Sequence, residues 1–252
     1  MTQHFRFARF ARFARITRIS GFRALAGIGM VASVVAIGGC KLDNNLGPGG
    51  GAQGLIQFIN AAPRYTSVNL KVDSAVAFSL QKYATGASRF IASLANARQL
   101  TVRDSANANT LAASPLLIAD RSVYLVILTQ HATGGNLLIF PDTVSAPPAN
   151  DVGLRLINAS PSAGRVDFYI TGSDSTLATA SATNIVYEGT SGYINVPNTG
   201  VLRVRVTAAG TKNVLLDVYP SLLTAGQARS IVLLDAVGGG LPATSLGVPD
   251  RG

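Results

Sequence analysis

The sequence predicts an all-β fold, in which two tandem immunoglobulin-like β-sandwich domains follow a signal peptide and a flexible tether. Three observations lead to it. Apolar and polar residues alternate in short runs such as LRVRV (202–206), as they do in a strand with one buried face. Turn-forming residues recur roughly every 8 to 12 positions, which is typical of sandwiches and barrels. Residues 154–170 repeat residues 56–72 at a fixed offset of 98 positions (154 − 56).

The first predicted element is a signal peptide at residues 1–39. A basic segment is followed by the uncharged apolar run ALAGIGMVASVVAI (24–37) and then by small residues, which is the layout of a secretory signal. The residues at its end resemble the lipobox of bacterial lipoproteins: Ile37, Gly38, Gly39 and Cys40. The resemblance implies cleavage before Cys40 and attachment of lipid to its thiol. Lys41 stands where an Asp would retain the protein, which implies passage to the outer membrane.

The net charge of +9 is concentrated in the predicted leader. Six arginines and no acid precede residue 40, several of them in FRFARFARFAR (5–15), and the remainder of the chain has fifteen basic and twelve acidic residues. Arginines at every third position spread around a helix, so this repeat favours a basic leader over a helix lying on a membrane. The remaining basic residues are scattered, so no nucleic-acid partner is expected.

A flexible tether is predicted from the lipidated Cys40 to residue 53, because KLDNNLGPGGGAQ is polar and rich in Gly and Asn. The first sandwich repeat is predicted at 54–146 and the second at 151–248. Two prolines in SAPPAND (145–151) mark the boundary, since proline interrupts a strand.

Later segments of the two repeats correspond as well. KYATGASRFI (82–91) resembles VYEGTSGYI (186–194), and Arg121-Ser122-Val123 is matched with Arg229-Ser230-Ile231. Each of the last two triplets opens a run that is apolar on both faces, VYLVIL and SIVLLDA. These runs are therefore expected to form central strands.

The segments INAAP (59–63) and INASP (157–161) each follow a short strand and lead into a second one. Together with the later Y-x-G-x-S-G-Y stretch, they resemble a bacterial envelope family, the domain of unknown function number 4397. The resemblance covers both repeats and implies secreted or lipid-anchored β-sandwich domains in tandem. It implies no established activity and supplies no catalytic residues.

The inventory of catalytic groups is small. Beyond the leader the chain has one histidine, His131, in a predicted turn, and its one glutamate is Glu188. Metal sites usually need several His or Cys ligands, and here Cys40 would be lipidated. No nucleotide-binding motif or G-x-S-x-G elbow occurs, so we expect no metal, no cofactor and no catalytic residues. Both side chains are expected to be solvated. A hydrolase remains a weaker alternative that would have to use His131 or Glu188.

Two further sets of residues are candidates for binding. Asn60, Pro63, Asn158 and Pro161 are expected to close turns at strand ends, because an Asn side chain can form an Asx-turn. The candidates for an aromatic binding surface are Tyr83, Phe90, Tyr187 and Tyr193, although packing at a core or an edge is the preferred interpretation.

These observations predict a lipid-anchored cell-envelope protein, not an enzyme, with a structural, adhesive or binding role. The alternative is a carbohydrate- or peptide-binding module of a larger envelope system. Envelope polymers or proteins are the expected partners, besides the membrane reached through Cys40.

Overall fold

The computed structural model describes residues 51–250, apart from 87–90, 143–144, 174, 199 and 221–222. All of these described residues belong to one compact unit of the chain, Asn44–Gly252. The predicted signal peptide, the lipobox with Cys40, the sorting residue Lys41 and the candidate Phe90 lie outside the described residues.

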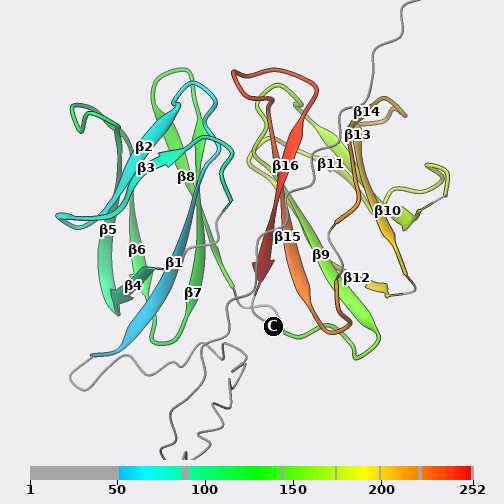
Figure 1. Cartoon of the computed structure of the whole chain (residues 1–252), viewed down its shortest axis with the longest axis horizontal. Coiled ribbons are helices and arrows are strands. Elements are labelled where there is room, and N and C mark those ends of the chain that lie inside the picture. The colour runs from blue at the N-terminus through cyan, green and yellow to red at the C-terminus, as the bar shows by residue number, and fades with distance from the viewer. Residues whose placement is uncertain are drawn as a thin grey trace, which may run out of the picture. The chain divides into compact units, whose positions relative to one another are not determined.

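The described part of the chain is all-β, with sixteen strands and no helix, which confirms the predicted fold class (Figure 1). The strands fall into two sets of eight. The first repeat contains β1 (Gln53–Asn60), β2 (Ser67–Val72), β3 (Ala75–Lys82), β4 (Ile91–Leu94), β5 (Asn96–Asp104), β6 (Thr110–Ile118), β7 (Val123–Gln130) and β8 (Gly135–Pro141). The second contains β9 (Asp151–Asn158), β10 (Val166–Gly172), β11 (Ala182–Ile185), β12 (Thr190–Pro197), β13 (Leu202–Ala208), β14 (Val214–Val218), β15 (Ala228–Leu234) and β16 (Thr244–Asp250).

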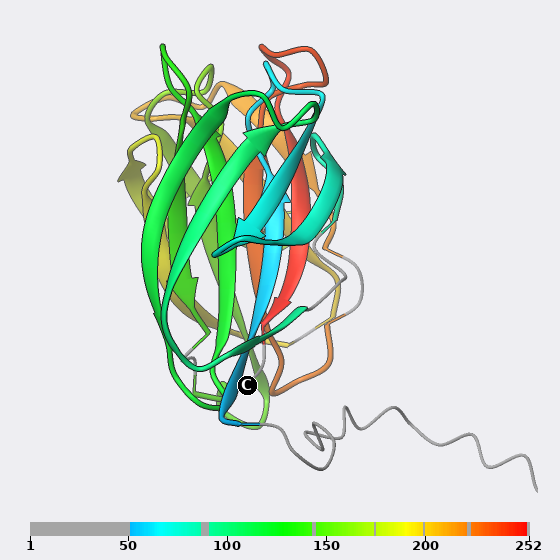
Figure 2. The same ribbon diagram turned by 90° about the vertical axis from the view of Figure 1, so that its left-hand side faces the viewer.

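Each repeat is a sandwich of two four-stranded sheets. The sheets of the first repeat have the orders β4-β1-β7-β8 and β3-β2-β5-β6, and those of the second have the orders β12-β9-β15-β16 and β11-β10-β13-β14. Adding eight to each strand number converts the first pair of orders into the second. The strands of the first repeat run side by side along its length in Figure 2. In both repeats the first strand pairs in parallel with the seventh, while its other neighbour is antiparallel.

The strand register confirms one predicted correspondence between the repeats and corrects another. Strand β9 lies at an offset of 98 from β1 at both of its ends, as the sequence predicts. Leu55 pairs with Val123, and its equivalent Gly153 pairs with Ala228. Val123 therefore corresponds to Ala228 and not to Ile231. The triplets Arg121-Ser122-Val123 and Arg229-Ser230-Ile231 have similar sequences but not equivalent positions. Relative to its partner strand, β15 begins three residues before Ile231.

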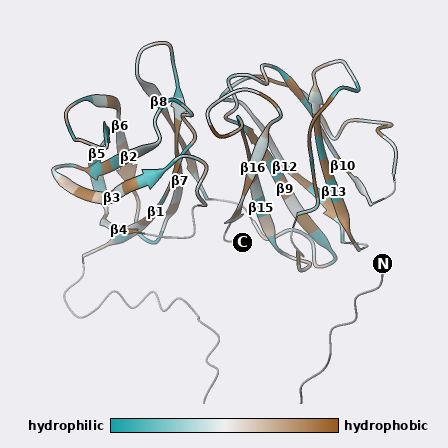
Figure 3. Ribbon diagram, turned by 45° about the horizontal axis from the view of Figure 1, so that its top comes forward, coloured by the Kyte–Doolittle hydropathy of each residue, from teal (hydrophilic) through white to brown (hydrophobic). Residues whose placement is uncertain are grey.

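Three apolar clusters stabilise the two repeats and the contact between them. One fills the sandwich of the first repeat, including Ile56 and Phe58, and another fills that of the second, including Leu154 and Leu156. A third cluster takes residues from both repeats, and we call it the inter-repeat cluster: Ile59, Ala61, Leu125, Ile127, Ile157, Ala159, Val232, Leu234 and Val248. Brown apolar and teal polar residues alternate along strands of both repeats in Figure 3.

The inter-repeat cluster explains why the runs in β7 and β15 are apolar on both faces. Val126 faces the core of its own repeat, whereas its neighbours Leu125 and Ile127 face the inter-repeat cluster. Both strands occupy internal positions in their sheets, as predicted. Full burial of one such aliphatic side chain contributes about 1.5 to 3 kcal/mol, so this cluster outweighs any single hydrogen bond between the repeats.

Candidate functional site

The segments INAAP (59–63) and INASP (157–161), which we call the Asn–Pro segments, form equivalent turns at the ends of β1 and β9. Asn60 and Asn158 are both completely buried. The side-chain oxygen of each accepts a hydrogen bond from the backbone N–H two residues later, over 3.1 and 3.3 Å, which closes the predicted Asx-turn. Each side-chain nitrogen also donates to a backbone carbonyl of the following loop, over 2.8 and 2.7 Å. The asparagines therefore shape the turns that carry Pro63 and Pro161.

Two tyrosines join the repeats next to these turns. The hydroxyl of Tyr83, in the first repeat, donates to the carbonyl of Asp235 in the second, over 2.8 Å. The hydroxyl of Tyr187, in the second repeat, donates to the carbonyl of Gln130 in the first, over 2.8 Å, and accepts from the N–H of the same residue over 3.0 Å. Burial raises the pKa of both phenols, that of Tyr187 to about 12, so both stay protonated donors at neutral pH.

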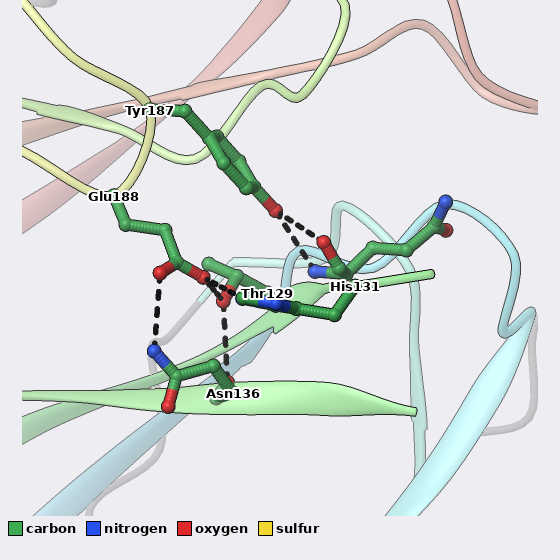
Figure 4. Close-up of polar contacts among 6 residues, drawn as sticks. Thr129, His131, Asn136, Tyr187 and Glu188 are labelled. Atoms are coloured by element: carbon green, nitrogen blue, oxygen red, sulfur yellow. Dashed lines mark hydrogen bonds and ion pairs between the residues drawn. The ribbon is translucent and has the colours of Figure 1, made fainter. Parts of the chain in front are cut away.

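Glu188 reaches from the second repeat into a polar cluster of the first (Figure 4). Its carboxylate accepts hydrogen bonds from the hydroxyl of Thr129 and from the side-chain amide of Asn136, the latter over 3.1 Å. The Nε2 atom of His131 lies 2.9 Å from the same carboxylate. We call these four residues the Glu188 cluster. Burial alone would raise the pKa of Glu188, but the bonds from the three partners outweigh it and lower the pKa below its ordinary value.

This arrangement corrects the expectation that Glu188 is solvated. Its side chain is 20% exposed and engaged by the other repeat, while that of His131 is 50% exposed. The structure thus joins the two residues that the sequence singled out for a hydrolase. Thr129 and His131 both contact the Oε1 atom of Glu188. These contacts join β7 and the turn after it to the loop between β11 and β12, so the carboxylate links the two repeats.

The remaining described aromatic candidate lies in a different setting. The guanidinium of Arg155 sits 4.4 Å from the ring centroid of Tyr193 and 5.2 Å from that of Phe140. Arg155 also pairs with Asp250 over 3.4 Å, and both of these side chains are buried. Tyr83, Tyr187 and Tyr193 are all partly buried, so the structure does not display them together as an open stacking surface.

A groove of about 510 Å³ is lined by the Asn–Pro turns of both repeats and by the loop after β15. Its lining residues are Pro63, Arg64, Gln130, Pro161, Ser162, Asp235, Gly238, Gly239 and Gly240. Gln130 and Asp235 are equivalent, since each lies two positions after the residue paired with Asn60 or Asn158. The groove therefore combines matching elements of two repeats. The recurrence of the Asn–Pro segments was the sequence signal for it, but the sequence does not show that the two turns meet.

Asp235 is the buried acid of this groove. One carboxylate oxygen accepts from the hydroxyl of Ser160 and from the N–H of Ser162 at 3.2 Å. The other accepts from the hydroxyl of Ser162 at 2.8 Å and from the N–H of Gly240 at 3.1 Å. Four donors from its own repeat occupy this carboxylate, so it orders the groove wall.

Among the described residues, no group of three or more His, Cys, Asp or Glu side chains is arranged to hold a metal ion. Within the same residues, no helix is long and apolar enough to cross a membrane.

Residues 54–169 match the family model of a domain of unknown function, DUF4397. The match takes in the first repeat, β9 and the start of β10, and it confirms the predicted resemblance for these residues. A search of the curated proteins found no match.

Several solved structures are weakly similar. A putative adhesin from Bacteroides ovatus is 10% identical, with 80% of this chain and 95% of that chain covered and a TM-score of 0.23. A structure described as alpha-glucan binding by a streptococcal virulence factor is 9% identical, with 71% and 92% covered and a TM-score of 0.24. The family CBM26 module of Eubacterium rectale Amy13K, in complex with maltoheptaose, is 9% identical, with 77% and 95% covered and a TM-score of 0.25. Scores this low support no argument about the present chain.

Proposed function

We propose, for a chain whose residues 54–169 match the DUF4397 family, a non-enzymatic binding or adhesive role at the cell envelope. The groove between the Asn–Pro turns is the proposed binding site. One observation carries this proposal: the equivalent Asn–Pro turns of the two repeats line a single open groove. The apolar packing of the inter-repeat cluster and of the sandwich cores does not by itself account for this groove.

The position of the groove along the strands supports display away from an anchor. Strand β1 begins at Gln53, where the predicted tether ends, and finishes at Asn60, where the groove-lining turn begins. Eight residues of strand extend over roughly 25 Å. A tether attached at Cys40 would therefore hold the groove at the far end of the sandwich from the membrane.

Lipid anchoring is a separate part of the proposal and has its own test. Cys40→Ser should abolish labelling of the protein by a radioactive fatty acid and leave the precursor uncleaved. Labelling that persists in this variant would show that the lipid is attached elsewhere or that Cys40 is not the anchor. Cell fractionation of the labelled wild-type protein would test the outer-membrane destination predicted from Lys41.

Binding can be tested with the mature protein on purified peptidoglycan, envelope glycans and envelope proteins. Arg64→Glu places an acid on the exposed rim of the groove and should abolish specific retention. Arg121→Glu is the matched control, because the side chain of Arg121 is 83% exposed and its N–H bonds to Gln53 at the tether end. Retention that is unaffected by Arg64→Glu would remove the groove from the proposal.

A further inference from the structure

We infer that the groove binds an extended acidic polypeptide segment and not a glycan. This inference rests on the proposed function, in which the groove is the binding site. It follows from the charge of the groove, from its backbone surface and from the kinds of side chain that line it.

The exposed charge of the groove is that of Arg64, because Asp235 is buried. Arg64 is exposed at the rim, and its position is fixed because its N–H donates to the side chain of Gln130 over 2.9 Å and its Nη1 donates to the carbonyl of Ala132 over 2.9 Å. A guanidinium carries five N–H donors, and the bond to Ala132 uses one of them. The acid of the groove, Asp235, already accepts from four donors. The groove thus presents a cation without a competing free carboxylate, which suits a carboxylate-bearing ligand.

The backbone surface of the groove suits an extended main chain. Gly238, Gly239 and Gly240 all have positive φ values, between 85° and 95°, and open space lies where the Cβ atoms of Gly238 and Gly240 would stand. Three consecutive residues without side chains let another backbone approach closely. The main chain of a bound peptide would lie against the open Gly238 and Gly240 positions, because the N–H groups of Gly239 and Gly240 are already bonded within the turn.

The apolar contacts beside this backbone are aliphatic. Val237 is 84% exposed and Leu241 is 48% exposed, and they flank the three glycines. Pro63 and Pro161 add two further apolar surfaces. Among the described residues that line the groove none is aromatic, and the hydroxyls of Tyr83 and Tyr187 form contacts between the repeats. A sugar ring would find no exposed aromatic face here, whereas aliphatic peptide side chains would find partners.

The experiment compares short acidic, neutral and basic peptides of matched apolar content with soluble peptidoglycan fragments and neutral glycans. Each probe is titrated against the full mature protein by calorimetry. We expect the acidic peptides to bind, with an affinity that falls at high salt. Arg64→Ala should weaken their binding about tenfold, since one charge-assisted contact is lost, and Arg64→Lys should weaken it less. Arg121→Ala should have no effect.

The outcomes separate this inference from the proposed function. Glycan binding that Arg64→Glu abolishes would keep the groove as the binding site and overturn the peptide assignment. Peptide binding that is equal for acidic and basic sequences, or that Arg64→Ala leaves unchanged, would also overturn it. Absence of binding by every probe, together with unchanged retention of envelope material by the groove variants, would reject the proposed function itself.

Discussion

Tyr83 and Tyr187 occupy equivalent turns of the two repeats, and each donates its hydroxyl to a backbone carbonyl of the opposite repeat over 2.8 Å. The residue after each tyrosine donates its backbone N–H to the last residue of the first strand in its own repeat, Ala84 to Asn60 and Glu188 to Asn158. Contacts are thus exchanged between the repeats with approximate twofold symmetry. The exchange differs at one position, where Glu188 enters a polar cluster while Ala84 packs against the inter-repeat cluster.

The tyrosine contacts can be separated by two matched variants. Tyr187→Phe removes a hydroxyl that makes two hydrogen bonds with the backbone of Gln130, whereas Tyr83→Phe removes one bond to Asp235. A neutral hydrogen bond contributes about 0.5 to 1.5 kcal/mol, so the loss of unfolding free energy should be about 1 to 3 kcal/mol for the first variant and about half of that for the second. Urea denaturation measures both. Equal stability of Tyr187→Phe and the wild type would contradict the link between repeats.

The Glu188 cluster gives a second prediction, which also addresses the hydrolase alternative. Glu188→Ala leaves the donors of Thr129 and Asn136 without their charged acceptor, and hydrogen bonds to charged groups contribute about 1.5 to 3 kcal/mol. We expect a loss of stability of about 2 kcal/mol and no change in binding at the groove. Asp120→Ala is the control and should cost less, because its carboxylate is 52% exposed and accepts only one exposed hydrogen bond, from the backbone N–H of Gln53, beside a surface ion pair. A hydrolytic activity that disappears in both Glu188→Ala and a folded His131→Ala would instead favour catalysis.

The lowered pKa of Glu188 predicts a dependence of stability on acid. The unfolded chain has the ordinary value of 4.5 and the folded chain a lower one, so the stabilisation is complete above about pH 4.5 and is lost as the pH falls through the folded value. Asp73, Asp104 and Asp217 also have lowered pKa values because of their hydrogen bonds. The readout is therefore the difference in unfolding free energy between wild type and Glu188→Gln, which should shrink below pH 4.5. A difference that does not depend on pH would show that the carboxylate is not held in its charged form.

The parts of this structure that follow from local patterns could be predicted from the sequence. Strand alternation and the Asx-turns at Asn60 and Asn158 depend on residues close together in the chain, and the repeat at offset 98 is visible by direct comparison of two segments. The doubly apolar run in β7 showed that a second face is covered, but the pattern could not say that the other repeat covers it. The sequence neighbours of Glu188 and His131 predict solvated side chains for both residues. Their pairing depends on how two sheets face each other, for which a period of two carries no signal.

The inter-repeat cluster yields the last prediction, which concerns cooperativity. Ile127 is completely buried between the repeats, and Ile127→Asp would place a carboxylate among apolar side chains at a cost of about 3 kcal/mol or more. The two sandwich cores keep their own apolar residues, so the repeats should still fold. We expect the wild type to unfold in a single transition in calorimetry, because the inter-repeat cluster couples the two repeats, and Ile127→Asp to unfold in two. Leu94→Asp, at a residue that is 51% exposed, should retain one transition. A single transition in Ile127→Asp, shifted no further than in Leu94→Asp, would show that the repeats are stable independently of their shared cluster.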